Sequence, residues 1–357
     1  MNRTVLYDAE RDRGARFADY DGWEKPVDFC DCLSEYHAMR EGVGLLDRSE
    51  RGKLLVSGAD RLTWLQGMIS NDVRPLGDTD KGAKAVCGCV LNATGHLLAD
   101  VKVINRGDSL LLDLFRPNLD KIHRLLDGFI ITEDVQVSDV SDSLACLSLQ
   151  GPAATEAFVR EHAHGAQFVA ADYTGLGGFD LYLDVSGAVA LWTRLVDSGI
   201  APVGEEAVET LRIEAGIPRY GADMDETTIP LECGIESSHI SQTKGCYVGQ
   251  EIIARIVARG HTNRALTGLL LEGSELPHKG DRILPTDGEA DREIGWVTSA
   301  CHSPLLGRGI AIGYVRHESR APGTHVRIDR GDGVVRAFTI DLPFRAPSES
   351  ESVLRSA

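Results

Sequence analysis

The chain has 357 residues, 43% of them apolar and 25% charged, so it is long enough for two or three domains that each bury a core. Acidic residues outnumber basic ones by 54 to 37, and the net charge of -17 argues against nucleic acid or an anionic membrane as the main partner, because both would be repelled. Eight cysteines in this length favour reduced thiols over a disulfide scaffold. No apolar stretch approaches a membrane-spanning length, and the first residues lack the apolar segment of an export signal. We therefore expect a cytoplasmic protein that neither binds nucleic acid directly nor enters a membrane.

The first 142 residues predict a mixture of strands and helices. Short apolar runs indicate strands, and apolar residues at helical spacing indicate helices. The expected strands are residues 54–56, 85–91, 97–104, 110–115 and 135–140, and the expected helices are residues 31–40, 58–70 and 117–127. The last of these helices has Pro117 at its start and Gly128 just past its end, which are favoured positions for these residue types.

The next segment, as far as residue 215, repeats this mixture in the order β-α-β-β-α-β, which is typical of a ferredoxin-like unit. The expected strands are residues 144–149, 167–171, 179–184 and 201–202, and the expected helices are residues 151–162, 188–198 and 205–215. Two such mixed units side by side predict an α+β fold.

After Arg264 the pattern changes to short strands separated by turn residues, which predicts a small all-β module, either a barrel or a sandwich. The expected strands are residues 266–271, 294–299, 309–315, 325–329 and 334–340. The final residues, 346–357, are rich in Ser and Glu and predict a flexible tail. The predicted domains are residues 1–262, built of two interleaved subdomains (51–142, and 1–50 with 143–262), and residues 263–345.

Residues 244–251 read Lys-Gly-Cys-Tyr-Val-Gly-Gln-Glu and bring a lysine, a thiol and a carboxylate close together. The two glycines predict a tight turn, and the apolar residues that follow predict a helix. Near a helix start, free backbone N–H groups and the helix dipole favour a thiolate at Cys246, and Lys244 adds a positive charge. The alternative is a turn whose cysteine is simply a small buried hydrophobe.

Three carboxylates are further candidates. Asp100 lies on or beside an apolar strand, where a carboxylate must be paired, hydrogen-bonded or face a cavity. It could share a proton with a base-like ligand, or it could be an aspartate at a sheet edge that bonds to the backbone. Glu214 lies near the end of a helix, where the dipole disfavours a negative charge, so it needs a local partner; a surface salt bridge is the alternative. Asp180 follows a glycine-rich turn and could point into the same cavity as Glu214.

The paired cysteines do not predict a metal site. Cys30 and Cys32, like Cys87 and Cys89, are too closely spaced for the usual paired zinc ligands, and no matching set of His or Cys follows them.

The motif of residues 244–251 is similar to the signature of the YgfZ-type folate-binding proteins, which are paralogues of the glycine-cleavage T-protein, the aminomethyltransferase. Other stretches resemble the wider T-protein superfamily, and the likeness runs from about residue 14 to about residue 315. These stretches are residues 14–23, 42–47, 71–73, 149–152, 173–180, 211–216, 221–226, 229–234, 294–298 and 303–304. The resemblance implies a three-domain ring of two ferredoxin-like units and a C-terminal β-barrel around a central channel that holds tetrahydrofolate.

The resemblance also implies roles for single residues. Asp100 matches the T-protein aspartate beside the reactive folate nitrogens, and Glu214 and Asp180 match acidic positions near the pterin. A carboxylate suits a pterin because it can accept two N–H bonds from the ring. Cys246 matches the signature cysteine required for YgfZ-type function, and Lys244 is its neighbour. The predicted catalytic residues are therefore Cys246, Lys244 and Asp100.

The net negative charge is unfavourable for a polyglutamylated ligand, so we expect a local basic cluster at the channel mouth that includes Arg255 or Arg259. The first hypothesis is a tetrahydrofolate-binding protein that supports the assembly or repair of iron–sulfur enzymes, including tRNA-thiolating ones, with those enzymes or their assembly factors as partners. The second is a folate-dependent aminomethyl- or methyltransferase. It is weakened because residues 47–50 read Asp-Arg-Ser-Glu where the T-protein has a histidine nearby. The third is a scaffold that has kept the fold without the ligand.

Overall fold

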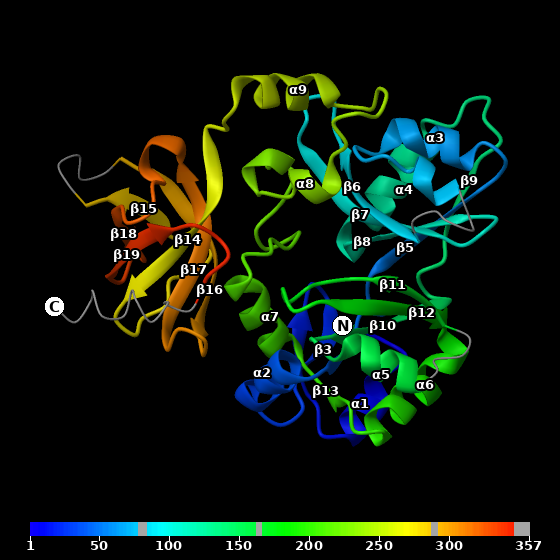
Figure 1. Ribbon diagram of the computed structural model, residues 1–357, viewed down its shortest axis with the longest axis horizontal. Helices are drawn as coiled ribbons and strands as arrows, with labels where there is room; N and C mark the ends of the chain where they lie inside the picture. The colour runs from blue at the N-terminus through cyan, green and yellow to red at the C-terminus, as the bar shows by residue number, and fades with distance from the viewer. Residues whose placement is uncertain (78–83, 162–165, 287–291, 346–357) are drawn as a thin grey trace. The chain divides into compact units, whose positions relative to one another are not determined.

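A computed structural model describes residues 1–77, 84–161, 166–286 and 292–345 of the chain (Figure 1). These residues form two compact units. Unit 1 comprises Met1–Val208 and Met224–Gly260, and unit 2 comprises Glu209–Asp223 together with the described chain from His261 onward. Among the described residues, none of the helices combines the length and the apolar composition needed to span a bilayer.

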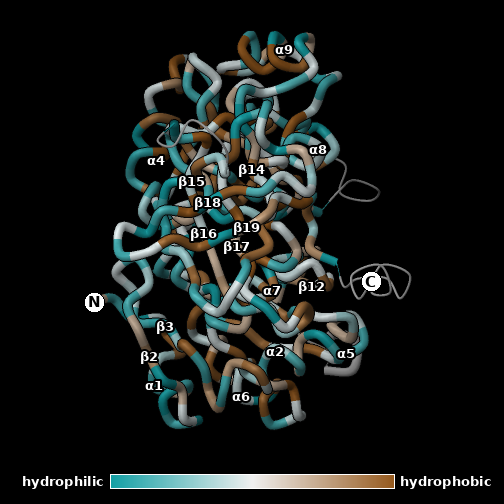
Figure 2. The backbone as a smooth tube through the Cα atoms, turned by 90° about the vertical axis from the view of Figure 1, so that its left-hand side faces the viewer, coloured by the Kyte–Doolittle hydropathy of each residue, from teal (hydrophilic) through white to brown (hydrophobic). Residues whose placement is uncertain are grey.

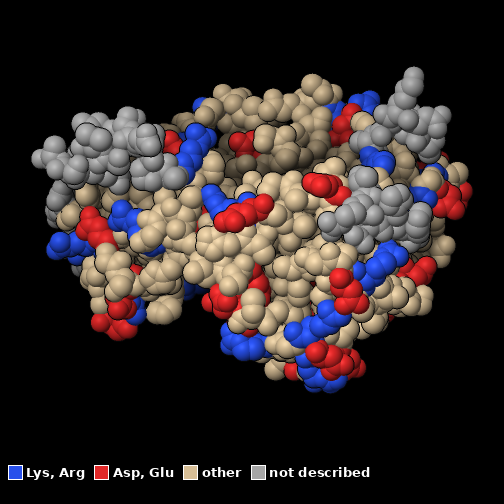
Figure 3. Space-filling view, turned by 60° about the horizontal axis from the view of Figure 1, so that its bottom comes forward, with Lys and Arg blue, Asp and Glu red and all other residues tan. Residues whose placement is uncertain are grey.

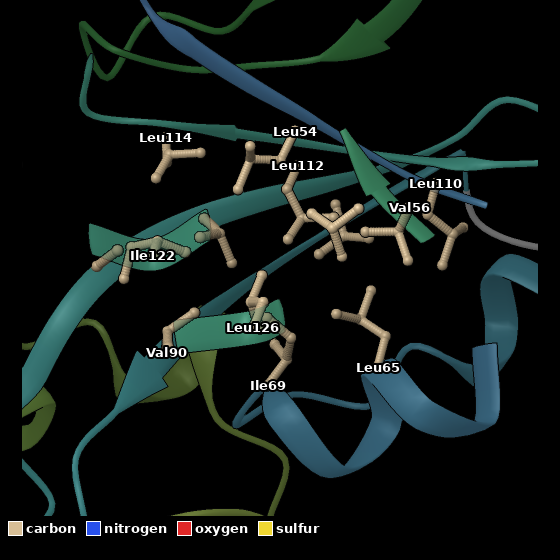
Figure 4. Close-up of a cluster of buried hydrophobic side chains, with 14 of the residues drawn as sticks. Leu54, Val56, Leu65, Ile69, Val90, Leu110, Leu112, Leu114, Ile122 and Leu126 are labelled. Atoms are coloured by element: carbon tan, nitrogen blue, oxygen red, sulfur yellow. The ribbon is translucent and has the colours of Figure 1, made fainter. Parts of the chain in front are cut away.

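The first sheet of unit 1 is antiparallel and has the strand order β6-β7-β8-β5-β9. Its strands are β5 Gly52–Ser57, β6 Ala85–Leu91, β7 Leu97–Asn105, β8 Leu110–Leu114 and β9 Gln136–Asp139. One face is covered by α3 Arg61–Met68 and α4 Leu119–Asp127, with the short turns η1 Arg74–Gly77 and η2 Arg116–Asn118 (Figure 1). Figure 4 shows Leu65 and Ile69 directed toward the strand side chains, and Ile122 and Leu126 of α4 in the same cluster. This face is therefore a sealed apolar core.

The second sheet of unit 1 has the order β11-β12-β10-β4-β13. Its strands are β4 Gly44–Asp47, β10 Leu144–Gln150, β11 Gln167–Ala170, β12 Gly178–Asp184 and β13 Ala201–Pro202. The helices of this half are α1 Tyr7–Asp12, α2 Cys32–Glu41, α5 Ala154–Glu161, α6 Val185–Asp197 and α7 Glu205–Glu214. Trp192 and Leu195 of α6 and Ala157 of α5 pack with the strand leucines in a second core. Three short strands, β1 Asn2–Arg3, β2 Arg16–Tyr20 and β3 Trp23–Asp28, form a small sheet in the order β1-β3-β2.

The two five-stranded sheets face each other across a layer of side chains that we call the inter-sheet layer. Successive residues of a strand point to opposite faces of its sheet. Alternate residues of each strand therefore lie in the helix-covered core, and the residues between them point into the inter-sheet layer. Part of the layer is apolar and joins Ile104 and Leu111 of the first sheet to Val169 and Tyr182 of the second. The rest is polar, because Lys102 of β7 bonds across the layer to Asp180 of β12. A buried polar site thus lies between two rigid sheets.

The end of unit 1 carries η3 Pro230–Glu232, α8 Glu236–His239 and α9 Gln250–Arg259. Gly249 precedes α9 with φ 84°, and a Cβ there would lie 2.5 Å from the Asn92 backbone oxygen, so only glycine fits this turn. Along the turns of α9, hydrophobic residues are interspersed with hydrophilic ones (Figure 2).

Unit 2 is a closed antiparallel barrel in the order β14-β17-β16-β15-β18-β19. Its elements are β14 Arg264–Glu272, β15 Arg282–Pro285, β16 Gly295–Ser303, β17 Arg308–Arg316, η4 His317–Ser319, β18 His325–Asp329 and β19 Val334–Ile340. Alternate strand residues such as Leu269, Val297 and Ile328 fill the interior. The last turns of α7 belong to this unit, because Ile213 packs with Leu270 on the outside of the barrel.

The surface of the protein mixes charges of both signs. In the view of Figure 3, Lys and Arg side chains lie next to Asp and Glu side chains. The ion pairs near the surface include Arg11 with Asp8 at 2.8 Å and Arg116 with Asp142 at 3.1 Å. Such surface pairs contribute little to stability.

The predicted fold class is confirmed: the chain has a mixed α and β region followed by a closed six-stranded barrel. The predicted helix at residues 58–70 is shorter than expected, because α3 begins only at Arg61, after the Gly58 turn. The helices α1 and α8 were not predicted, and α8 has only four residues. The predicted domain boundaries stay a prediction, and the predicted flexible tail lies outside the described residues.

Candidate functional site

Asp100 lies in the middle of β7, opposite Cys89 of β6, and its side chain belongs to the same strand face as Lys102. Its Oδ1 atom is buried and has no hydrogen-bond partner among the described residues. A buried carboxylate oxygen without a donor is costly, and a ligand N–H group would satisfy it. The site therefore fits a ligand that donates hydrogen bonds, as a reduced pterin does.

Asp180 forms the second part of the polar layer and is fully buried. Its Oδ2 atom accepts hydrogen bonds from Lys102 Nζ and from the Tyr173 hydroxyl, each at 2.6 Å. Burial opposes ionisation of Asp180, but the charges of Lys102 and Arg48 outweigh it, so the pKa of this carboxyl is lowered. Asp180 is therefore an ionised group whose Oδ2 holds two neighbouring side chains in place.

Two arginines close this network. The Arg48 guanidinium lies over the Tyr173 ring, 4.0 Å from its centroid. Arg51 pairs with Asp113, which also accepts a hydrogen bond of 2.8 Å from the Tyr182 hydroxyl. Three buried cations, Lys102 and the two arginines, thus surround the carboxylates of the inter-sheet layer.

The positive charge of Arg51 also bears on Asp100, since the two side chains attract each other electrostatically. The carboxylate that has an unsatisfied oxygen therefore interacts with a cation of the inter-sheet layer.

Lys244 lies in the turn before α9. Its ammonium group donates to the backbone oxygens of Gln66, Ile69 and Asn71, at 2.6 Å for Gln66 and 2.9 Å for Asn71. Burial lowers the pKa of Lys244 to about 8. These carbonyls lie at the C-terminal end of α3, where a cation is favoured by the helix dipole. The contacts of Lys244 therefore anchor the turn to the end of α3 and to the segment that follows it.

Cys246, two residues further on, is exposed, and all eight cysteines are free. Arg255 is exposed on α9. Among the described residues, no group of three or more His, Cys, Asp or Glu side chains is arranged to hold a metal ion.

Glu214 lies at the end of α7 and belongs to unit 2. It is buried, and its Oε1 accepts hydrogen bonds from the Ser303 hydroxyl and from the Leu305 backbone N–H, the latter at 3.3 Å. These donors offset the unfavourable helix-dipole position that the sequence indicated.

The structure thus brings Asp100 and Asp180 into one layer and places Lys244, Cys246 and Arg255 on the turn and helix that end unit 1. Sequence reasoning missed Lys102, although its position two residues after Asp100 on a strand puts both side chains on one face. It also missed Arg51 and Tyr173, which reach the layer from loops, where no periodicity signals them.

Two family models match the chain. The GCVT N-terminal domain matches residues 6–167 and 160–239, and the glycine cleavage T-protein C-terminal barrel domain matches residues 264–345. The chain belongs to the glycine cleavage T-protein family. Tetrahydrofolate, the cofactor predicted from the sequence, is confirmed by this membership.

Individual relatives agree with this assignment. An aminomethyltransferase from Rubrobacter xylanophilus is 34% identical over 362 residues, which cover 96% of this chain and 94% of the relative. An aminomethyltransferase from Nostoc sp. is 30% identical over 370 residues and covers 96% of both chains. The crystal structure of glycine cleavage system aminomethyltransferase T from Bartonella henselae has the same fold, with a TM-score of 0.87 at 23% identity over 97% of this chain and 98% of that chain.

The first functional hypothesis from the sequence is wrong. A YgfZ-type role in iron–sulfur enzyme assembly was predicted from the eight residues of the 244–251 motif, whereas the similarity to aminomethyltransferases spans 96% of the chain. The YgfZ-type assignment and the iron–sulfur partners are unsupported, and the second hypothesis, the transferase, accounts better for these relatives.

Proposed function

We propose that this protein is a tetrahydrofolate-dependent aminomethyltransferase of the glycine-cleavage T-protein type. The relatives named aminomethyltransferase support the reaction class, since they match nearly the whole chain. The observation that carries the proposal in the structure is Asp100 Oδ1, a buried acceptor without a donor in a layer of charged groups. When bound, tetrahydrofolate supplies the nitrogen that accepts the one-carbon unit.

Asp100 would accept an N–H bond from the folate and keep that nitrogen in the orientation for attack. Lys102, Tyr173 and Asp180 would act as the rigid wall behind it, because Asp180 is fully buried and its Oδ2 atom already accepts two strong bonds. In this proposal Asp180 positions the site through its Oδ2 atom, while its Oδ1 atom, which is also buried and has no hydrogen-bond partner among the described residues, is a second acceptor for the ligand.

The proposal also includes the other residues that the sequence singled out. Glu214 and Arg255 would contribute to folate binding, and the exposed Cys246 would be a reactive thiol. For Lys244 the geometry favours an anchoring role, because the same nitrogen contacts three carbonyl oxygens.

The test is turnover of tetrahydrofolate with S-aminomethyl thiol donors, amine donors and sulfur-bound methyl donors. Methylene- or methyl-tetrahydrofolate and released ammonia would be measured together. The wild type should convert an S-aminomethyl donor and release one ammonia for each methylene group transferred. Asp100→Asn should lose about 10²-fold or more in kcat, because it removes the negative charge and replaces one carboxylate oxygen by an amide NH2 group that cannot accept an N–H bond.

Asp108→Asn is the matched control. Asp108 lies in the turn after the same strand, is exposed, and should tolerate the change with unchanged turnover. Calorimetry with tetrahydrofolate decides whether the ligand binds at all. Absence of binding to the wild type, or full activity in Asp100→Asn, would contradict the proposal.

A further inference from the structure

A histidine lies near Asp100, and the sequence did not single it out. His239 is the last residue of α8, and α8 packs against β6, the strand that pairs with β7 at Asp100. The negative charge of Asp100 acts on the His239 ring. His239 therefore lies within electrostatic reach of the carboxylate whose Oδ1 has no hydrogen-bond partner among the described residues.

Hydrogen bonds hold His239 firmly against β6. The Ser70 hydroxyl donates to the His239 backbone oxygen at 2.6 Å and accepts from the Cys89 backbone N–H at 2.8 Å. The Asn71 side-chain amide donates to the Cys87 oxygen at 2.8 Å and to the backbone oxygen of Ser238, the residue before His239, at 2.9 Å. Two side chains thus tie the end of α8 to the strand that faces Asp100.

The chain after α8 is fastened at a second point. Ser241 N–H donates to the Ser70 backbone oxygen at 3.1 Å, and the three carbonyl contacts of Lys244 follow three residues later. The segment from Ser238 to Lys244 is therefore held along its length, and His239 has little freedom to move away from the site.

One tautomer of the ring satisfies both hydroxyl contacts of Ser238 at once. The Ser238 hydroxyl lies 3.2 Å from the Ile235 carbonyl oxygen and 2.7 Å from His239 Nδ1. A carbonyl only accepts and a hydroxyl has one proton to give, so both contacts are satisfied together when Nδ1 carries the ring proton. Nε2 is then the basic nitrogen of the neutral ring.

Asp100 is the charged group that acts on the His239 ring. Burial lowers the pKa of His239, and the charge of Asp100 opposes this effect. Burial also raises the pKa of the Cys89 and Cys233 thiols, so both are neutral near pH 7. The titratable groups that accompany His239 on α8, on β6 and β7 and in the turn before α8 include Cys87, Cys89, Asp100, Lys102, Cys233 and Glu236.

We propose that His239 is the proton-holding partner of Asp100, with its Nε2 and the Asp100 carboxylate exchanging one proton through the ligand at the proposed folate site. This inference rests on the proposed function. Transfer from an S-aminomethyl donor to give methylene-tetrahydrofolate breaks the carbon–sulfur bond and the carbon–amine bond, and it forms two bonds from the carbon to folate nitrogens. Two protons leave these nitrogens, one joining the departing amine and the other the departing thiolate, so protons balance and nothing is oxidised or reduced. His239 Nε2 holds the proton that passes from a folate nitrogen to the amine.

The first test does not need turnover. Imidazole signals of the full-length, ligand-free protein labelled in histidine would be followed by NMR across pH, and His239→Gln would identify the His239 signal among the 11 histidines. We expect Nδ1 to be the protonated nitrogen in the neutral ring. The titration midpoint of His239 should fall in Asp100→Asn, because the charge that stabilises the imidazolium is gone, and should stay unchanged in Asp108→Asn. An equal midpoint in Asp100→Asn would overturn the inference.

The second test is kinetic. His239→Gln should lower kcat by about 10²-fold, the range of general acid–base catalysis. The acidic limb of its pH–rate profile should disappear, while the dissociation constant of tetrahydrofolate changes less than about threefold. The control His37→Gln changes an exposed histidine on α2 and should behave as wild type. A His239→Gln profile that runs parallel to the wild type would show a merely structural role. If the wild type turned over no donor, the proposed function would fail, and the NMR titration would still decide whether the pair exists.

Discussion

At the scale of single residues, the notable feature is the density of buried charge between the two sheets of unit 1. Lys102, Arg48 and Arg51 face Asp180 and Asp113 with little access to solvent. The free energy lost when such groups leave water is about as large as the free energy gained from their mutual attraction. They therefore stabilise the fold less than an apolar layer of the same shape would. We infer that the layer is retained because it keeps a polar ligand site rigid and ionised.

The pair of Lys102 and Asp180 gives a direct test. Lys102→Met keeps the length of the side chain but leaves Asp180 buried without its cation. We expect a loss of about 3–5 kcal/mol in the free energy of unfolding, because one member of a buried pair stays behind uncompensated. Urea denaturation at neutral pH measures this loss.

Two further variants make this result interpretable. Lys121→Met breaks an ion pair with Glu226 in which both partners are partly exposed, and it should cost less than about 1 kcal/mol. The double variant Lys102→Met with Asp180→Asn should cost less than the sum of the two single variants, since no lone charge remains. Equal losses for Lys102→Met and Lys121→Met would show that the buried pair has no special cost.

At the scale of elements, α9 is defined by a glycine at each end. Gly249 precedes it with φ 84° and Gly260 follows it with φ 83°, so both adopt the left-handed conformation. Their surroundings differ. A Cβ at Gly260 would meet open space, whereas a Cβ at Gly249 would lie 2.5 Å from the Asn92 backbone oxygen. The start of α9, unlike its end, is thus fitted tightly to the turn that precedes β7.

These two glycines form a matched pair for mutation. Gly260→Ala should cost about 1 kcal/mol, the price of the left-handed conformation alone. Gly249→Ala should cost at least 1–2 kcal/mol more, since the added atom forces the backbone of a neighbouring turn to move. Thermal unfolding followed by circular dichroism compares them. Similar melting temperatures would mean that α9 can shift away from Asn92 without loss.

The elements that sequence reasoning found are those with strong periodicity. The apolar runs of β7 and β8 and the helical spacing of Leu119, Ile122 and Leu126 in α4 predicted their elements nearly to the residue. The four-residue α8 is too short to show any period, so His239 could not be placed near Asp100. Arg51 and Tyr173 could not be predicted as site residues for a related reason. Their contacts depend on how the two five-stranded sheets of unit 1 pack together.

At the scale of the whole molecule, the function was misjudged because a short motif was given more importance than the full length of the chain. Residues 244–251 suggested one branch of the superfamily, and the relatives over 96% of the chain indicate another. The motif has a structural use in this protein, since Lys244 anchors it and Gly249 fits the turn. Residues with such packing duties can be shared by proteins whose chemistry differs.

The division into two units predicts two unfolding transitions. Both sheets of unit 1 share the inter-sheet layer, so this unit should unfold cooperatively, while the barrel has its own core. Tetrahydrofolate at 100 times its dissociation constant adds about 2.7 kcal/mol to the state that binds it. Differential scanning calorimetry should therefore show the transition of unit 1 rising by about 5–10 °C, at roughly 2–4 °C per kcal/mol for a domain of this size.

Lys102→Met identifies that transition, because it should lower the melting temperature of unit 1 alone. Asp100→Asn should abolish most of the ligand-induced rise while leaving both ligand-free transitions near their wild-type temperatures, since Asp100 Oδ1 has no protein partner to lose. A rise that persists in Asp100→Asn would place the ligand elsewhere in the molecule. A ligand-free Asp100→Asn protein that melts far below the wild type would instead mean that the carboxylate is needed for folding. The unsatisfied Oδ1 atom would then not indicate a ligand site.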